Sequence, residues 1–186
     1  MIKIYFNSNF TGFEDKERIL LDTGILLALN NKYDAWHKTV SNLFEDHILG
    51  ENDKSIFLFL NPLILNEVTF LAGKPFDNYV KKHPRKNLNI INPQKVIDCT
   101  VNGIKDLIEA EVLIVVDGNK DSTLKQISLY KELGSADASN AAIANELELN
   151  FLTVDGRLAN QMIKNKAKLS NIKKVYTTIS IHQTYK

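Results

Sequence analysis

Cysteine is almost absent from this sequence: Cys99 is the one cysteine in 186 residues. A lone cysteine cannot form a disulfide within the chain, and the helical, partly buried setting expected for Cys99 argues against a catalytic thiol. The first residues, MIKIYFNSNFTGFEDKE, also lack the uninterrupted apolar core of a signal peptide. Both absences favour a reducing, cytoplasmic setting.

Long hydrophobic runs and an excess of one charge are absent as well. The longest strongly apolar stretch, IFLFLNPLIL, is too short to cross a bilayer and is interrupted by Asn61-Pro62, so no membrane partner is expected. The formal net charge is only +1. Such a charge gives no general attraction to nucleic acid, and a nucleic-acid partner must therefore be bound by a local patch.

Two common kinds of ligand site are missing. The histidines at 37, 47, 83 and 182 are scattered without the spacing of zinc ligands. Neither a G-x-x-x-x-G-K-[ST] loop nor a G-x-G-x-x-G loop for phosphate is present. The remaining candidates for chemistry are the acidic residues.

What the sequence does contain is an alternation of apolar runs with amphipathic segments. Its length and its 44% hydrophobic and 24% charged residues are typical of one globular domain, here residues 1–186. Strands are predicted at 1–6, 18–23, 55–60, 112–118, 151–155 and 173–180, and helices at 25–44 with a break near Asn30-Asn31, 62–73, 94–111, 121–134, 135–150 and 156–166. This order predicts an α/β fold, a three-layer α/β/α sandwich with a central, mostly parallel sheet.

Two segments stand apart from this alternation. Residues 1–17 add an edge strand and a loop before the first buried strand, and residues 74–93 form a variable basic segment of short helix and loop. Helix starts are predicted at Asn61-Pro62, at Asp121 or Ser122, and at Ser135, because these side chains can cap free backbone amides.

Four carboxylates occupy positions where a charge is costly. Asp22 and Asp155 each end a buried strand, and Asp137 lies in the first turn of a helix rich in small residues. Glu67 lies within an apolar helix that is expected to have little solvent-facing surface. Each of these acids has an ordinary alternative role, since strand-end acids cap helices and Asp137 complements a helix dipole.

The four acids together favour a cation site. Ligands bind to open parallel sheets at the carboxyl ends of the strands, where Asp22 and Asp155 are expected. No run of arginine or lysine is interleaved with these acids to neutralise them. Hard divalent cations such as Mg²⁺ and Mn²⁺ prefer oxygen ligands of this type, so the sequence predicts a site for one of them.

The tripeptide Asp22-Thr23-Gly24 is also the loop signature of the aspartic proteases. Those enzymes are almost wholly β and bring two such loops together so that two carboxylates share a proton. This chain has one such tripeptide, and helical periodicity follows it. The sequence therefore argues against an aspartic protease.

The motifs resemble those of the PIN-domain nucleases. The segments that carry the resemblance are ILLDTGILLAL, LNPLILNEVTFLA, LGSADASNAAIANELEL and NFLTVDGRL, in the order and spacing of that family over most of the chain. The resemblance implies that Asp22, Glu67, Asp137 and Asp155 are catalytic and bind Mg²⁺ or Mn²⁺. It also implies supporting roles for three polar residues, Thr23, Asn140 and Thr153.

The resemblance implies a metal-dependent ribonuclease that hydrolyses RNA phosphodiester bonds. Many such relatives are toxins neutralised by a small antitoxin protein, so an antitoxin and a second copy in a homodimer are candidate partners besides RNA. The basic cluster Lys81, Lys82, Arg85 and Lys86 is the candidate RNA-binding patch, with a merely solvated loop as its alternative.

Two other functions stay open at this point. One is a non-catalytic PIN-like module that binds RNA or protein. The other is a different Mg²⁺-dependent phosphoryl-transfer enzyme, although the haloacid-dehalogenase phosphatases need Asp-x-Asp and this chain has Gly24 at the second acidic position. Asp117 and Glu132 are expected to be bystanders with ordinary solvated or capping roles.

Overall fold

The centre of the fold is a sheet of six parallel strands. The computed structural model describes residues 1–50, 54–86, 88 and 90–179. The strands are β1 (Ile2–Tyr5), β2 (Glu17–Leu21), β3 (Ile56–Leu60), β4 (Leu113–Val115), β5 (Asn150–Leu152) and β6 (Lys174–Thr177). Their order across the sheet is β1-β6-β5-β2-β3-β4, and every neighbouring pair is parallel.

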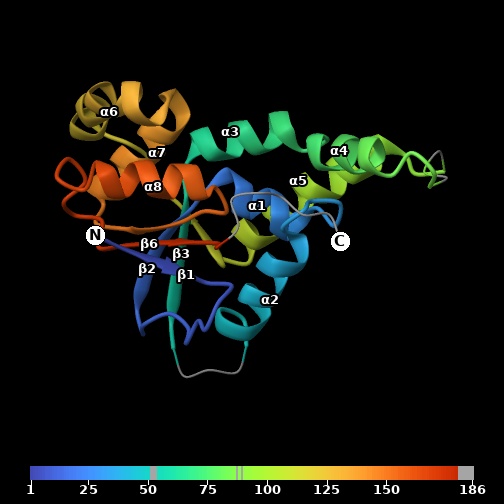
Figure 1. Cartoon of the computed structure of the whole chain (residues 1–186), viewed down its shortest axis with the longest axis horizontal. Helices are drawn as coiled ribbons and strands as arrows, with labels where there is room; N and C mark the ends of the chain where they lie inside the picture. Colours follow the sequence, from blue (N-terminus) through green and yellow to red (C-terminus); the bar gives the residue numbers. More distant parts are fainter. Residues whose placement is uncertain (51–53, 87, 89, 180–186) are drawn as a thin grey trace.

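Helices form a layer on each face of this sheet (Figure 1). They are α1 (Thr23–Asn30), α2 (His37–His47), α3 (Pro62–Leu71), α4 (Lys74–Lys82), α5 (Pro93–Glu109), α6 (Lys120–Leu133), α7 (Ser135–Glu146) and α8 (Gly156–Lys164). Helices α1, α2 and α5 pack together on one face, whereas α7 and α8 lie against the other. The predicted three-layer α/β/α sandwich is confirmed, and the described strands are parallel throughout.

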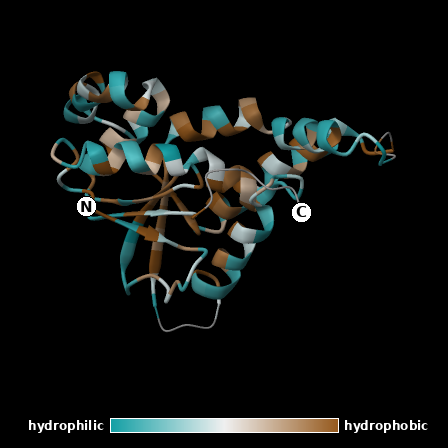
Figure 2. Ribbon diagram, in the orientation of Figure 1, coloured by the Kyte–Doolittle hydropathy of each residue, from teal (hydrophilic) through white to brown (hydrophobic). Residues whose placement is uncertain are grey.

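The central strands are apolar because helices cover both of their faces. On β2 the side chains of Ile19, Leu20 and Leu21 are fully buried, as are those of Phe151 and Leu152 on the neighbouring β5. Figure 2 shows the corresponding concentration of hydrophobic residues on the strands and of hydrophilic ones on the outer helices. This packing fixes the carboxyl ends of β2 and β5, where Asp22 and Asp155 follow.

Three expectations about burial were wrong. Residues 112–118 were expected to form a buried strand, but β4 is an edge strand on which Ile114 and Val115 are 37% and 49% exposed. Helix α3 was expected to have little solvent-facing surface, yet Phe70 is 87% exposed because only one side of the helix faces the core. Cys99 was expected to be partly buried and is exposed.

The helix starts are partly as predicted. Asn61 caps α3, with its Oδ1 accepting from the Ile64 amide at 2.9 Å. Helix α6 begins at Lys120 and its cap is Asn119, not Asp121 or Ser122 as predicted. Asn119 and Ser122 form a reciprocal capping box. The predicted cap at Ser135 was also wrong: Ser135 is already helical, and the cap is Gly134, whose φ of +91° favours glycine.

The basic segment and the last strand are only partly within the described residues. Helix α4 accounts for the first half of residues 74–93, and residues 87 and 89 lie outside the description. The strand predicted at 173–180 is β6, which ends at Thr177, and Ser180 and His182 fall outside the described residues.

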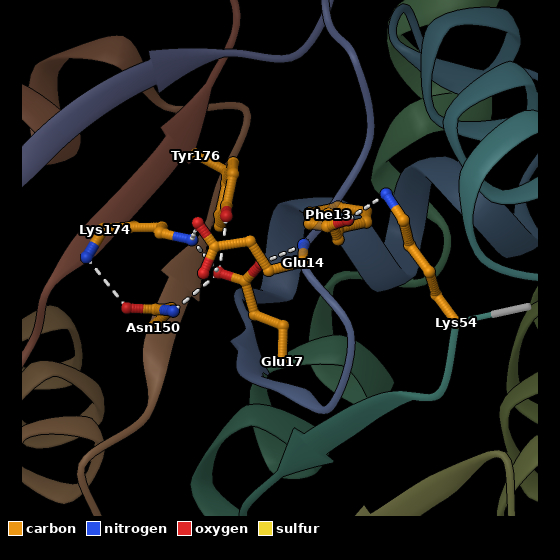
Figure 3. Close-up of polar contacts among 7 residues, drawn as sticks. All are labelled: Phe13, Glu14, Glu17, Lys54, Asn150, Lys174 and Tyr176. Atoms are coloured by element: carbon orange, nitrogen blue, oxygen red, sulfur yellow. Dashed lines mark hydrogen bonds and ion pairs between the residues drawn. The ribbon is translucent and has the colours of Figure 1, made fainter.

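A buried glutamate joins the amino ends of β2, β5 and β6 (Figure 3). Glu17 Oε1 accepts hydrogen bonds from Asn150 Nδ2 at 2.7 Å and from the Tyr176 hydroxyl, and it lies 3.3 Å from Lys174 Nζ. The Glu14 amide donates to Glu17 Oε2 at 2.8 Å. These contacts supply the hydrogen bonds and the positive charge that a buried carboxylate needs. They lie at the amino ends of the strands, whereas Asp22 and Asp155 lie at the carboxyl ends.

Candidate functional site

The candidate site lies where the order of the strands changes direction. The chain passes from β2 to β3 and β4 on one side, whereas β5 and β6 lie on the other side of β2. Asp22 follows β2, and its Oδ2 accepts a 2.6 Å hydrogen bond from Thr153 Oγ1, directly after β5. Asp22 is 6% exposed and Thr153 is fully buried. The two strand ends thus meet at the position where parallel sheets bind ligands.

A glycine permits this close approach. A Cβ at Gly24 would lie 2.9 Å from Val154 Cγ2, a separation that real Cβ atoms essentially never show. The Asp-Thr-Gly sequence therefore needs its glycine for packing of the α1 start against the segment after β5. This is a different use of the tripeptide from the one in aspartic proteases.

Helix α3 adds the glutamate predicted for the site. Thr23 Oγ1 donates to Glu67 Oε2 at 2.6 Å, which links the first residue of α1 to the middle of α3. Glu67 is half-buried. The two hydroxyls predicted to have supporting roles, Thr23 and Thr153, thus each donate to one of the predicted acids.

Helix α7 contributes Asp137 and Asn140. Asp137 is half-buried in the first turn of α7, where the helix dipole favours a negative charge. Asn140 is fully buried one turn later, and its Oδ1 accepts from Asn61 Nδ2 at 3.0 Å. Among the described residues Asn140 Nδ2 has no hydrogen-bond partner. The alanines of α7 at 138, 141, 142 and 144 are fully buried.

Asp155 has the capping role that was the alternative for a strand-end acid. Its Oδ1 accepts from the amides of Arg157 at 2.7 Å and Leu158 at 3.0 Å, at the start of α8. Its own amide donates to Thr153 Oγ1 at 2.9 Å, so one hydroxyl connects Asp22 and Asp155. The cap occupies only one oxygen, and Asp155 Oδ2 lies 3.7 Å from Arg157.

The acids interact electrostatically. Burial, with smaller contributions from the charges of Asp137 and Glu67, raises the pKa of Asp22 to about 7, although the hydrogen bond from the Thr153 hydroxyl opposes this rise. Burial also raises the pKa of Asp137 to about 6, with contributions from Asp155 and Glu67 opposed by Arg157. The four predicted acids are therefore electrostatically coupled to one another, although they come from separate sequence motifs.

A pocket of about 1020 Å³ surrounds these acids. Besides Asp22, Glu67, Asp137 and Asp155 it is lined by a fifth acid, Asp34, whose pKa burial also raises. The sequence reasoning missed Asp34 because it lies in the break between α1 and α2, outside any motif.

Cations also line this pocket, although no run of arginine or lysine is interleaved with the acids in the sequence. Lys74 and Asn78 come from α4, and a row of four residues comes from α8: Arg157, Asn160, Gln161 and Lys164. The spacing of the α8 row, i, i+3, i+4 and i+7, places these side chains on one helix face and was available in the sequence. The positive charges of Lys74, Arg157 and Lys164 thus lie in the lining of the pocket.

The chemical type of the pocket's ligand atoms suits a hard cation. These atoms are carboxylate oxygens with crowded negative charge, which Mg²⁺ or Mn²⁺ would neutralise. Among the described residues, however, no three His, Cys, Asp or Glu side chains are already grouped closely enough to hold an ion. Binding would require Glu67, Asp137 and Asp155 to converge further on Asp22.

The remaining predicted residues lie outside the pocket lining. Lys81 and Lys82 end α4, and Arg85 and Lys86 follow it; all four are exposed. Asp117 is exposed and accepts from the next amide, and Glu132 pairs with Lys168 at 2.9 Å. The described part of the chain contains no helix long and apolar enough to span a membrane.

The sequence matches no protein-family model, and no curated protein is significantly similar to it. The geometry described above is therefore the basis for a functional assignment.

Proposed function

We propose that this protein is a Mg²⁺- or Mn²⁺-dependent ribonuclease of the PIN type that hydrolyses phosphodiester bonds. The observation that supports the proposal most is the electrostatic coupling of Asp22, Glu67, Asp137 and Asp155 in one pocket at the change of strand order. Carboxylates crowded in this way oppose folding unless a cation offsets their charge, and such cost is typical of functional sites.

Each residue has a distinct task in this proposal. Asp22 and Asp137 would hold the cation together with Glu67, and Asp155 would contribute through the oxygen that does not cap α8. When bound, Mg²⁺ or Mn²⁺ supplies an activated water for attack on the phosphodiester and offsets negative charge on the phosphate. Thr153 and Thr23 keep the Asp22 and Glu67 carboxylates in place by donating to one oxygen of each.

The cations on the pocket walls would bind the substrate. Lys74 and Lys164 can hold phosphates of the substrate, because they line the pocket from two different helices, α4 and α8. Arg157 can assist by lowering the pKa of Asp137, which keeps that carboxylate ionised at neutral pH.

A second candidate function is a non-catalytic module that binds RNA or protein. The observation in its favour is that no three acidic side chains of the described residues are grouped for an ion, while Asp155 already caps α8. The same experiment separates the two candidates.

The test is cleavage of a mixture of RNAs by purified protein with Mg²⁺ or Mn²⁺ and with EDTA. Hydrolysis by an activated water leaves 5′-phosphate and 3′-hydroxyl ends, whereas attack by the RNA's own 2′-hydroxyl leaves a cyclic phosphate. We expect the former ends, with metal only, and loss of cleavage in Asp22→Asn. Cleavage that persists in EDTA contradicts the proposal, and absence of cleavage under all conditions supports the binding module.

A further inference from the structure

A second pocket, of about 700 Å³, lies beside the edge strand β1 and is called the edge pocket below. Its lining comes from β1, from residues 8–15 of the loop before β2, from Lys54 before β3, and from Lys174 and Tyr176 of β6. Among the described residues, none lines both this pocket and the pocket around Asp22. Its volume lies within the usual range for small-molecule sites, which is about 300 to 1,000 Å³. The edge pocket is therefore a candidate for a second ligand site.

The loop that forms one wall of the edge pocket is held by contacts with a distant segment. Lys54 Nζ donates to the Phe13 carbonyl at 2.7 Å (Figure 3), and the Ser55 amide donates to Asp15 Oδ1 at 2.9 Å. Gly12 turns the loop with a φ of +94°, a conformation that glycine adopts without steric cost. Small-molecule sites are usually largely preformed, and these contacts form the wall before any ligand binds.

Lys174 supplies a positive charge to the edge pocket from β6. Its side chain is 15% exposed, and its Nζ lies 2.7 Å from Glu14 Oε1 and 3.3 Å from Glu17 Oε1 (Figure 3). The Glu17 oxygen also accepts hydrogen bonds from Tyr176 and Asn150, so Lys174 shares it with two other donors. The closer partner of Lys174 is therefore Glu14.

The Glu14 carboxylate marks a position for an anion. The hydrogen bond from Lys174, together with its charge, lowers the pKa of Glu14, so the ammonium group favours a negative charge at this point. The Glu14 side chain is 77% exposed, and ion pairs of exposed side chains contribute little to stability. The Glu14 carboxylate can therefore turn into solvent and leave its position to the carboxylate of a ligand.

The charges of the lining favour an anionic ligand over a cationic one. The charged residues of the lining are Lys3, Lys54, Lys174, Glu14 and Asp15. When Glu14 turns into solvent, three ammonium groups and one carboxylate remain. The balance is still positive, at three lysines against two acids, when the buried Glu17 next to Lys174 is counted as well. A cation would meet the opposite preference.

Aromatic rings provide apolar surface in the same pocket. Phe10, Phe13 and Tyr176 meet edge to face, with ring centroids 4.9 to 5.9 Å apart. Phe13 and Tyr176 are buried, whereas Phe10 is half-buried and Tyr5 is 38% exposed. The exposed surface of these last two rings can pack against a further ring, since aromatic groups attract one another in such arrangements. The lining thus combines positive charge with accessible aromatic surface.

We propose that the edge pocket binds a small aromatic carboxylate, whose anionic group replaces the Glu14 carboxylate at Lys174 and whose ring packs against Phe10 and Tyr5. A carboxylate is the group that already occupies this position in the structure. The site goes beyond the proposed hydrolysis of RNA and does not depend on it. In this arrangement Glu14 competes with the ligand for Lys174.

Binding is tested by ¹H–¹⁵N NMR titration of the full chain with 3-phenylpropionate. Two matched probes separate the requirements of the site: acetate has the carboxylate without the ring, and 3-phenylpropylamine has the ring with an ammonium group. The test variant is Glu14→Gln, which removes the competing charge from an exposed side chain. The control variant is Glu109→Gln, which removes the same charge from an exposed ion pair with Lys105, outside the lining of the edge pocket.

We expect 3-phenylpropionate to shift the amide signals of residues 10–14 and of Lys174. It should bind at least about tenfold more tightly than acetate or 3-phenylpropylamine, because it alone uses both the cation and the rings. Glu14→Gln should bind it about two- to fivefold more tightly, since an exposed ion pair competes only weakly. Glu109→Gln should bind it as wild type does.

Lys174→Gln should bind 3-phenylpropionate at least about tenfold more weakly, because it removes the charge that holds the carboxylate. This substitution also removes a partner of the buried Glu17, and its NMR spectrum shows whether the variant folds. Glu14→Gln changes only an exposed side chain, so it keeps the test valid if Lys174→Gln does not fold.

Equal affinity for 3-phenylpropionate and 3-phenylpropylamine overturns the proposal, because charge would then not select the ligand. Equal affinity of wild type and Glu14→Gln, or shifts confined to the residues around Asp22, also overturns it. The same holds if neither wild type nor Glu14→Gln shows shifts at about 10 mM 3-phenylpropionate, a concentration that detects even weak binding. Each of these outcomes is independent of whether the protein cleaves RNA.

Discussion

The hydroxyl of Thr153 donates a 2.6 Å hydrogen bond to Oδ2 of Asp22, 131 residues earlier in the chain. This bond joins the carboxyl ends of β5 and β2 at the point where the strand order changes direction. Thr153 Oγ1 also accepts from the Asp155 amide. The Thr153 hydroxyl thus contacts both Asp22 and Asp155, so its removal tests how this hydrogen bond affects the acids.

Replacing Thr153 by valine should raise the pKa of Asp22 above its value of about 7. The hydroxyl stabilises the ionised carboxylate, and valine keeps the shape without the donor. Carboxyl ¹³C chemical shifts of Asp22, titrated in EDTA, measure the pKa directly. Thr153→Ser, which keeps a donor, is the matched control and should titrate close to wild type. An Asp22 pKa unchanged in Thr153→Val would mean that the bond does not form in solution.

The raised pKa of Asp22 makes stability depend on pH. The folded state binds the proton of Asp22 more tightly than the unfolded chain, whose carboxyl has a pKa of about 3.9. The contribution to stability is therefore fully present below about pH 4 and is lost as pH rises to about 7, a loss on the order of 4 kcal/mol. In EDTA, Asp22→Asn should lack this loss and melt at a higher temperature than wild type at pH 8.

Thermal melts at pH 4 and pH 8 measure that difference. The difference in melting temperature between wild type and Asp22→Asn should be small at pH 4, because Asp22 is protonated there. A gap that is equal at both pH values would assign the effect to packing of the side chain instead of its charge.

Asp137→Asn should likewise melt above wild type in EDTA at neutral pH. Its carboxylate is destabilised by burial and by Asp155 and Glu67, although Arg157 offsets part of this effect. Excess Mn²⁺ should narrow the gap, because a ligand at about 100 times its dissociation constant stabilises the folded state by about 2.7 kcal/mol and the variant lacks a full site. If the variant is less stable in EDTA and Mn²⁺ shifts neither protein, Asp137 is a structural helix-start residue.

The acids of the pocket should differ from the bystanders in activity. Glu67→Gln and Asp137→Asn should each lower the rate of RNA cleavage by orders of magnitude, since each removes a charge that would hold the cation. Asp117→Asn and Glu132→Gln should change it little, because both side chains are away from the pocket lining. Single-turnover rates of the four variants make the comparison. Similar losses in all four would mean that the site is elsewhere.

Glu17, which is buried at the amino ends of the strands, should affect stability and not activity. Glu17→Ala leaves the Tyr176 hydroxyl and Asn150 Nδ2 without their acceptor, although Lys174 keeps its 2.7 Å pair with Glu14, and it should lower the free energy of unfolding by about 3 to 5 kcal/mol. Glu109→Gln, which breaks an exposed pair with Lys105, should cost less than about 1 kcal/mol. Urea unfolding measures both. A loss below about 1 kcal/mol for Glu17→Ala would show that the network is not coupled to folding.

The fold could be predicted from the sequence because its signals are local. Buried parallel strands such as 18–23 are continuous apolar runs, and the break at Asn30-Asn31 was readable between α1 and α2. The edge position of β4 could not be predicted, because residues 112–118 are as apolar as a central strand. Ile114 is exposed only because β4 is the last strand in the order of the sheet.

The candidate site could be predicted only in part, because its residues come from separate segments. Motifs singled out Asp22 and Glu67, but the hydroxyl partners Thr153 and Thr23 became specific only through the folded distances. Asp34 has no motif, since it reaches the pocket from a loop. The cations at the pocket walls were not singled out because Lys74 and Lys164 lie outside the motifs that carry the acids, and because Arg157 lies in the first turn of α8.

The central claim is that the coupled acids bind a divalent cation, and Mn²⁺ binding to the purified protein tests it most directly. Electron paramagnetic resonance of free Mn²⁺, titrated with wild type, Asp22→Asn and Asp117→Asn, gives the affinity of each protein without RNA. We predict saturable binding by wild type and Asp117→Asn, and binding by Asp22→Asn at least about tenfold weaker, because it loses a charged oxygen ligand. Equal affinity in all three proteins, or no binding by wild type, would contradict the account.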